Sequence, residues 1–305
     1  MDKNILKLLC AITVLIASSC EKIIEIKADP IPPVLVINGM IQTSDSCLIH
    51  VFSTDSSYNE FRDWRPIDIK GANVFLENQS GEREQLQYTK QWGGYIGKPR
   101  NPGDQLKLIV SHTNYPTVYA ETLVPRNPSS FNATNTITYE EEGSSFKEYR
   151  VDFDWTYNSR PRYILGEVQQ KIKQRKGTWP LYDTITTYHN ENLHTYDARV
   201  FAIVDPIEDL DGTRYLGNQA YIENVGNQDR VKISLYWDEY SSGEAEQEMY
   251  ATISILSEEA YRFFTQAILQ DYTKYNPFAS AVNVQGNIEN GYGIFYAVNK
   301  SRVKL

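Results

Sequence analysis

The segment from Ser257 to Phe295 carries the clearest periodic pattern in the sequence and constrains the fold most strongly. Ser257 is a candidate helix N-cap, whose hydroxyl would accept a hydrogen bond from the first turn, and Pro277 ends the pattern. No other segment shows so clear a helical period, so we predict an amphipathic helix over residues 257–275 and β-structure elsewhere. Its apolar face, spaced three and four residues apart, comprises Ala260, Phe263, Phe264, Ala267 and Ile268.

The residues after this helix indicate a turn and a last strand. Val282 and Val284 are followed by the glycine-rich segment Gly286–Gly291, and glycine readily adopts the backbone angles of tight turns. We therefore expect a glycine turn that leads into a final strand over Gly293–Val298. The helix would then cover an apolar face or end of the sheet, with a functional groove as the alternative.

The first residues form a targeting segment and not part of the fold. Lys3 and Lys7 precede an apolar run over Leu8–Ala17 that is too short to span a bilayer. Small residues follow and end at Cys20, which resembles a bacterial lipoprotein signal. We therefore predict that residues 1–19 are a lipoprotein signal peptide and that Cys20 is the lipid attachment residue. An ordinary secretory signal with a chance cysteine is the alternative.

The cysteines and the charge limit the classes of function. Cys10 would leave with the signal and Cys20 would carry lipid, so Cys47 is alone and is predicted to be packed in the interior. Residues 20–33 contain three prolines and are predicted to be an extended tether behind the anchor. A formal net charge of −9 argues against nucleic acid as a partner.

Residues 34–126 are predicted to form the first domain, a β-sandwich of the immunoglobulin-like or transthyretin-like kind. Short β-branched runs recur at regular spacing and are separated by glycine and proline turns, which is typical of such sandwiches. The expected strands are Val34–Ile41, Cys47–Phe52, Ala72–Glu77, Gln85–Tyr88, Trp92–Ile96, Leu106–Val110 and Tyr115–Val124.

Residues 131–305 are predicted to form a second β-rich domain, which contains the helix near its C-terminal end. The boundary falls at Arg126–Ser130, where proline and serine cluster. Lys171–Tyr196 is polar and aromatic and is predicted to be a long hairpin that turns at Trp179 and Pro180. The other expected strands are Tyr149–Trp155, Tyr163–Val168, Arg199–Val204, Ala220–Val225, Arg230–Trp237 and Glu248–Leu256.

Residues that could carry catalysis or bind a metal are few. The four histidines, His50, His112, His189 and His194, have no metal-binding spacing. The acidic loop 205–212 clusters oxygen ligands before a glycine, so a calcium loop and a plain turn both remain open. Asp152 and Asp154 alternate with core residues, as expected of a solvated strand face. Because no catalytic motif is present, we predict no catalytic residues, no cofactor and no metal.

Aromatic residues in the loops of the first domain are the candidate binding surface. Large aromatic side chains in loops can form an interaction patch, or they can cover the end of the sandwich. The residues are Tyr58, Phe61, Trp64 and Trp92.

Several segments together resemble a lipoprotein family of Bacteroidota that is known as a domain of unknown function. Cys20 is followed by Glu21 and Lys22, as in surface-exported lipoproteins of that group, and then by Leu35–Gly39. The C-terminal segments are the more specific ones: Leu256–Phe264, Asn276–Phe278, Gly286–Ile288 and Gly291–Phe295. The resemblance implies a lipoprotein facing the cell exterior on the outer membrane, often encoded beside a TonB-dependent receptor, and it supplies no catalytic or ligand residues.

Three classes of function follow. The first is a binding or accessory partner of a TonB-dependent nutrient importer, held to the membrane by its lipid alone. The second is a structural or adhesive β-sandwich lipoprotein of the cell surface, which suits the tether equally well. An enzyme is the third, and the absence of a catalytic constellation places it last.

Overall fold

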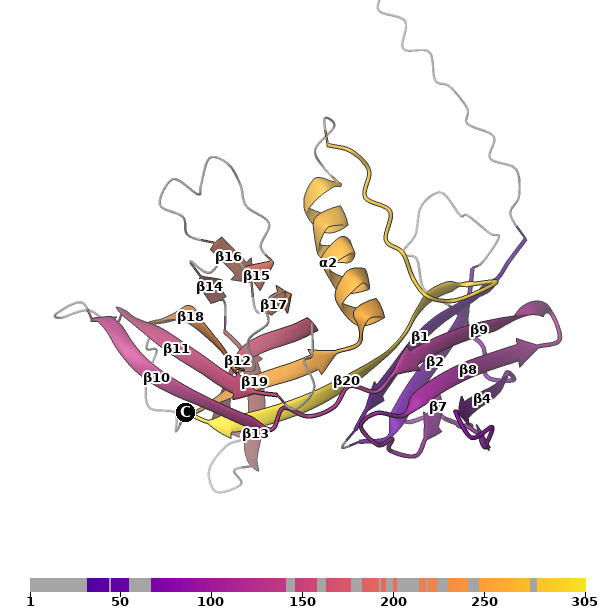
Figure 1. Cartoon of the computed structure of the whole chain (residues 1–305), viewed down its shortest axis with the longest axis horizontal. Coiled ribbons are helices and arrows are strands. Elements are labelled where there is room, and N and C mark those ends of the chain that lie inside the picture. Colours follow the sequence, from indigo (N-terminus) through magenta and orange to yellow (C-terminus); the bar gives the residue numbers. More distant parts are fainter. Residues whose placement is uncertain are drawn as a thin grey trace, which may run out of the picture. The chain divides into compact units, whose positions relative to one another are not determined.

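The computed structural model divides into two compact units, residues 1–32 and residues 33–305. Except for Pro32, the residues it describes all belong to the second unit (Figure 1). They are 32–43, 45–54, 67–140, 146–157, 163–176, 183–191, 193–195, 200–201, 214–217, 219–223, 230–240, 247–274 and 279–305.

The described part of the chain is mainly β, as predicted, with three sheets and a helix near the C-terminus. The largest, here called the long sheet, has 11 strands. Its main path follows the order β15 (Val200–Phe201), β17 (Ala220–Glu223), β12 (Tyr163–Lys176), β19 (Gln247–Leu256), β20 (Tyr292–Lys304), β1 (Leu35–Gln42), β2 (Cys47–Ser53), β7 (Gly94–Gly97) and β6 (Gln87–Thr89). Off this path, β13 (Asp183–Asn190) pairs with β12, and β3 (Ile67–Asp68) pairs with β2.

Two smaller sheets complete the β-structure. The four-stranded sheet has the order β5 (Arg83–Gln85), β4 (Asn73–Asn78), β8 (Gln105–His112) and β9 (Tyr115–Leu123). The five-stranded sheet has the order β10 (Ser130–Glu140), β11 (Phe146–Thr156), β18 (Arg230–Tyr240), β14 (Leu193–Thr195) and β16 (Arg214–Gly217).

The N-terminal core has the sandwich arrangement that the strand pattern predicts. Alternate residues of β1 and β2 pack against alternate residues of the four-stranded sheet, so that one face of each sheet is buried. Cys47 is fully buried in this core, as expected, and burial raises the pKa of its thiol to about 11. Other members of the core are Leu35, Ile37, Ile49, Val51, Val74, Leu76, Leu108 and Val110.

A second core joins the five-stranded sheet to the long sheet. The predicted alternation over Tyr149–Trp155 is confirmed, since Val151, Phe153 and Trp155 are buried and Tyr149 stacks on Trp237 with ring centroids 4.4 Å apart. The long sheet contributes residues from β12 and β19, among them Ile164, Val168, Ala251, Ile253 and Ile255.

Strand β20 connects the two cores within one sheet. It pairs antiparallel with β19 and parallel with β1, where Val36 lies opposite Tyr292. The predicted boundary at Arg126–Ser130 falls between β9 and β10, and the long sheet crosses from one predicted domain to the other through β20. The final strand runs to Lys304, six residues beyond the predicted end at Val298.

Helix α2 spans Glu258–Thr273 and packs over β20, β12 and β19. Ala260 is fully buried, whereas Phe264 and Ile268 are partly buried against the long sheet. The expected cap bond is absent: Ser257 makes no side-chain bond to the first turn, and its Oγ instead accepts a 3.4 Å bond from the Ala297 N–H of β20. The serine therefore ties the start of the helix to the long sheet.

Three segments differ from the predicted elements or extend them. The expected strand Gln85–Tyr88 is split, because buried Leu86 separates β5 in the four-stranded sheet from β6 in the long sheet. Strand β10 is not predicted at all. The long hairpin is confirmed, since β12 and β13 pair antiparallel from Gln169–Asn190 to Lys176–Asp183, although its expected turn at Trp179 and Pro180 lies outside the described residues.

Within the described residues, no helix has the length and apolar character needed to cross a membrane.

Candidate functional site

Only one of the predicted contact residues is described by the structure, and it is exposed. Trp92 has 57% of its surface exposed and precedes β7 in a turn where Gly93 has a φ of +61°. Tyr58, Phe61 and Trp64 lie outside the described residues. Cys20 and the acidic loop 205–212 lie outside them too.

The turn that carries Trp92 is attached to an aromatic residue of the long sheet. The carbonyl oxygen of the neighbouring Gly93 lies 3.1 Å from His50 Nδ1. The ring of His50 in turn stacks on Phe52, with centroids 5.9 Å apart and planes inclined by 2°. Both residues alternate in β2 with fully or nearly fully buried residues, so their side chains leave the sandwich core on its outer face.

Tyr292 extends this group across two more strands. It lies opposite Val36 in the parallel pair of β20 and β1, and Val36 lies opposite Phe52 in the pair of β1 and β2. Laterally paired residues point to the same face of a sheet, so Tyr292 shares the outer face with Phe52, and it is 58% exposed. We call His50, Phe52, Trp92 and Tyr292 the aromatic surface.

The strand that follows the other predicted contact residues lies beside this surface. β3 pairs with β2, and its Asp68 lies opposite Phe52 of the aromatic surface. Tyr58, Phe61 and Trp64 precede β3 in the sequence and lie outside the described residues. One sequence signal for this surface was missed. Strand β2 has apolar residues on both faces, with Ile49 and Val51 on the buried face and Leu48 and Phe52 on the other, and this pattern indicates a second packing surface.

A cavity of about 540 Å³ is a second feature of interest. It is lined by the end of β9 with the residues that follow it, and by the end of β19 with the first residues of α2. The lining is mixed, with an apolar wall and the side chains of Arg126, Ser257, Glu258 and Glu259. Glu258 pairs with Arg262 one turn further along the helix.

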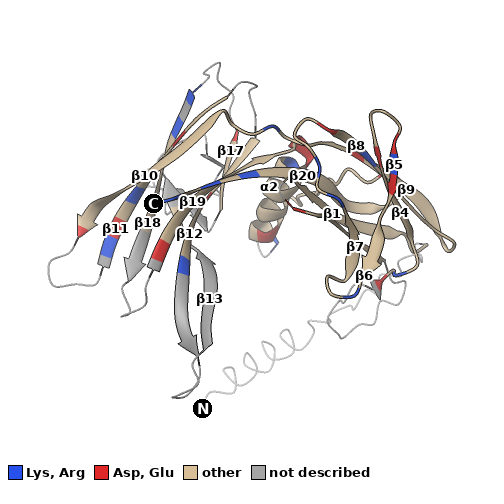
Figure 2. Ribbon diagram, turned by 90° about the horizontal axis from the view of Figure 1, so that it is seen from below, with Lys and Arg blue, Asp and Glu red and all other residues tan. Residues whose placement is uncertain are grey.

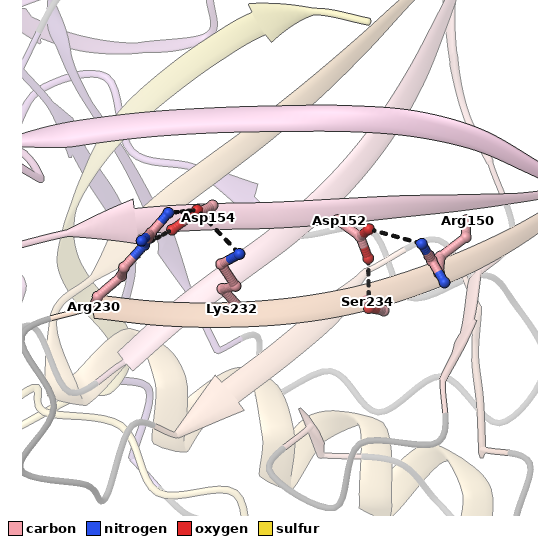
Figure 3. A network of polar contacts seen from close by, with 6 residues as sticks. All are labelled: Arg150, Asp152, Asp154, Arg230, Lys232 and Ser234. Carbon is pink, nitrogen blue, oxygen red and sulfur yellow. Dashed lines mark hydrogen bonds and ion pairs between the residues drawn. The ribbon is translucent and has the colours of Figure 1, made fainter.

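The outward face of the five-stranded sheet carries a network of charged side chains from β11 and β18 (Figure 3). Arg230 Nε donates to Asp154 Oδ1 at 2.7 Å, and Lys232 lies 3.7 Å from the same carboxylate. On the neighbouring rung, Asp152 accepts a 2.6 Å bond from Ser234 Oγ and pairs with Arg150 at 3.2 Å. Figure 2 shows that β11 carries both acidic and basic residues.

Both carboxylates of this network are paired with basic side chains, which limits what they can do chemically. The hydrogen bond from Arg230 holds the pKa of Asp154 below its usual value, so this carboxyl stays ionised at neutral pH and is no proton donor there. The expectation that Asp152 and Asp154 occupy a solvated strand face is confirmed by their partly exposed positions. Their partners on β18 were not identified from the sequence, because cross-strand neighbours depend on register.

The described histidine side chains, those of His50 and His112, belong to no group of residues that could bind a metal. His112 packs against Tyr115 with ring centroids 5.2 Å apart, and its Nδ1 accepts a 3.2 Å bond from the Asn114 N–H. Among the described residues, no group of three or more His, Cys, Asp and Glu side chains could hold a metal ion. The side chains of His189 and His194 are outside the described set.

Comparison with known proteins gives a family but no function. No curated protein matches the sequence. Among solved structures, a crystal structure of a Salmonella alpha-2-macroglobulin mutant matches at 10% identity and a TM-score of 0.26, over 91% of this chain and 15% of that chain. This chain thus spans about 15% of the length of that macroglobulin. The family model described as "Domain of unknown function (DUF4249)" matches residues 21–304, and the protein therefore belongs to the DUF4249 family.

Proposed function

We propose that this protein is a surface-exposed lipoprotein of a bacterial outer membrane, of Bacteroidota type. In this proposal it serves as the binding or accessory partner of a TonB-dependent nutrient importer. The lipid on Cys20 holds it at the membrane, and the aromatic surface contacts the receptor. The observation that carries the proposal is the exposure of Trp92 and Tyr292, at 57% and 58%, on either side of β2, which carries His50 and Phe52.

Two exposed aromatic residues on a sheet face suit a protein interface. Aromatic side chains are enriched at the centres of interfaces and supply much of the binding energy. Between them, His50 and Phe52 stack on each other on β2, a strand whose other face is buried. A rigid support lowers the entropy lost when the side chains are fixed by a partner.

The lipid anchor would strengthen a modest interface. A protein tethered to the same membrane as its partner binds at a high effective concentration, so the two need few contacts to stay together. The small residues before Cys20 and the proline-containing tether over residues 20–33 support this part of the proposal. The sequence resemblance described above supports the choice of receptor.

The proposal is tested by affinity purification of the tagged full-length protein from membranes in mild detergent. We expect a receptor barrel to co-purify in comparable amount. A Trp92→Ala, Tyr292→Ala double variant should lose the receptor, whereas the matched control Tyr139→Ala should retain it, since Tyr139 is 53% exposed on the five-stranded sheet. Recovery of the tagged protein alone, with the receptor expressed, would contradict the proposal.

One observation favours the structural or adhesive alternative. Strand β10 is at the edge of the five-stranded sheet, and Ile137 and Tyr139 on it are 47% and 53% exposed. Exposed edge strands with apolar residues can pair with another copy. If the protein alone formed concentration-dependent assemblies in analytical ultracentrifugation, and if a charged residue at Ile137 abolished them, this alternative would be the better one.

A further inference from the structure

The cavity beside the start of α2 has the character of a ligand site. Two segments form its walls, Leu123–Arg126 and Ile255–Glu259, together with Gly103. Its volume of about 540 Å³ falls within the range of about 300–1,000 Å³ that is usual for small-molecule sites. We propose that this cavity binds a short peptide with apolar side chains, and that it recognises the free ammonium and carboxylate groups of the peptide.

Glu259 supplies the group that would hold the ammonium. It lines the cavity and is partly exposed, and its carboxylate pairs with no basic side chain in the described part of the protein. A carboxylate without a basic partner attracts a cation in a partly enclosed site more strongly than on an open surface. A ligand ammonium in the cavity would supply the opposite charge.

Arg126 supplies the group that would hold the carboxylate. Its guanidinium is placed against the turn at Gly103, where a Cβ would lie 3.2 Å from Arg126 Nε, and Gly103 has a φ of +94°. Within the described ranges, Arg126 makes neither a hydrogen bond nor an ion pair. The planar guanidinium can donate two parallel bonds to a carboxylate.

Ser257 adds an unused donor to the same wall. It is 6% exposed, and its Oγ accepts the long bond from the Ala297 N–H, but its O–H donates to none of the described groups. A peptide carbonyl or carboxylate oxygen in the cavity would accept this bond. The two charged groups and the hydroxyl therefore match a peptide backbone with free ends.

The apolar wall indicates the side chains that the peptide would carry. Leu123 is 56% exposed although it lines the cavity, and Val124, Pro125 and Leu256 lie in the same lining. Covering Leu123 with an apolar ligand side chain would remove its surface from water, which is favourable. A leucine-containing dipeptide is therefore a suitable probe.

The test is titration calorimetry of the full-length lipidated protein in detergent, without any receptor. The probes are leucyl-leucine, its N-acetyl form and its C-terminal amide. We expect leucyl-leucine to bind and both blocked forms to bind at least tenfold more weakly. The variants Glu259→Gln and Arg126→Gln should each weaken leucyl-leucine at least tenfold, whereas the controls Glu121→Gln and Arg83→Gln, outside the cavity lining, should not.

A coupling measurement identifies which group each residue contacts. In Glu259→Gln, N-acetylation of the peptide should lower the affinity no further, whereas amidation should still lower it. In Arg126→Gln, amidation should lower the affinity no further, whereas N-acetylation should still lower it. Failure of leucyl-leucine to bind the native protein would overturn the proposal, and so would equal binding of the blocked forms. Both of these measurements use the native protein, so they do not depend on whether a variant folds. Because no receptor is present, the result is independent of the proposed partnership with an importer.

Discussion

Gly293 offers a sharp test of how the two cores are joined. It is the second residue of β20, has a φ of +102°, and faces the backbone of β1 so closely that a Cβ would lie 1.9 Å from the carbonyl oxygen of Ile37. We expect Gly293→Ala to be strongly destabilising, because it combines an unfavourable backbone angle with a collision that only a shift of β20 away from β1 relieves.

The size of the effect follows from these two contributions. Holding a non-glycine residue at such a backbone angle costs about 1–3 kcal/mol. Overpacking costs a further 1–3 kcal/mol or so, and the obstacle here is a backbone atom that cannot rotate away. The free energy of unfolding should therefore fall by about 2–6 kcal/mol.

Gly81 provides the matched control. Its φ is +78°, but a Cβ at this position would meet nothing within 4 Å, so Gly81→Ala carries the backbone cost alone. Each Gly→Ala change also lowers the conformational entropy of the unfolded chain, which stabilises the fold by the same amount in both variants and so cancels in the comparison. Urea unfolding followed by tryptophan fluorescence should show Gly293→Ala as the less stable by about 1–3 kcal/mol; equal losses would refute the close approach of β20 to β1.

Three further predictions concern the helix, the pH dependence and the anchor. Phe264→Ala should lower the free energy of unfolding by about 3 kcal/mol, the low end for a phenylalanine truncation, because the ring is partly buried against Tyr296; an unchanged urea midpoint would contradict this. Hydrogen bonds from Lys171 and Lys304 lower the pKa of Glu248 from 4.5 to about 2. The contribution of Glu248 to stability is therefore present above pH 4.5 and is lost as the pH falls towards 2. Glu248→Gln should flatten the acidic part of a plot of stability against pH, and an unchanged acidic part would argue against these two ion pairs. Cys20→Ala should move the protein from the membrane to the soluble fraction, and unchanged fractionation would exclude the lipid anchor.

The elements that could be predicted from the sequence are those whose own residues repeat with a clear period. The alternation over Tyr149–Trp155 and the helical stripe around Phe264 depend on local spacing, and both are found in the structure. Strand β10 was missed because Asn135 interrupts the alternation of Phe131, Ala133, Ile137 and Tyr139 with polar residues, and asparagine is depleted in strands. Its extended conformation depends on pairing with β11, which is a property of the assembled sheet.

The same distinction explains the candidate surface. Trp92 was identified because a tryptophan beside a glycine turn is conspicuous in the sequence. Tyr292 was not, because its place on the same sheet face as Phe52, with β1 between them, follows from a parallel pairing between the two ends of the described chain. Ser257 illustrates the reverse case: its position at the start of the helix was predictable, but its bond to Ala297 required the fold.

The parallel pairing of β1 with β20 has a consequence for how the protein is made. Thr43 Oγ1 donates to Asn299 Oδ1 across 256 residues of chain, so contacts at the first strand have a very high sequence separation. Such contacts form late, since a large loop must close before they stabilise anything. The pairing of β1 with β20 therefore cannot be complete until the chain has been made as far as Val298. A chain truncated before Tyr292 would leave that edge of β1 open to pairing with other molecules.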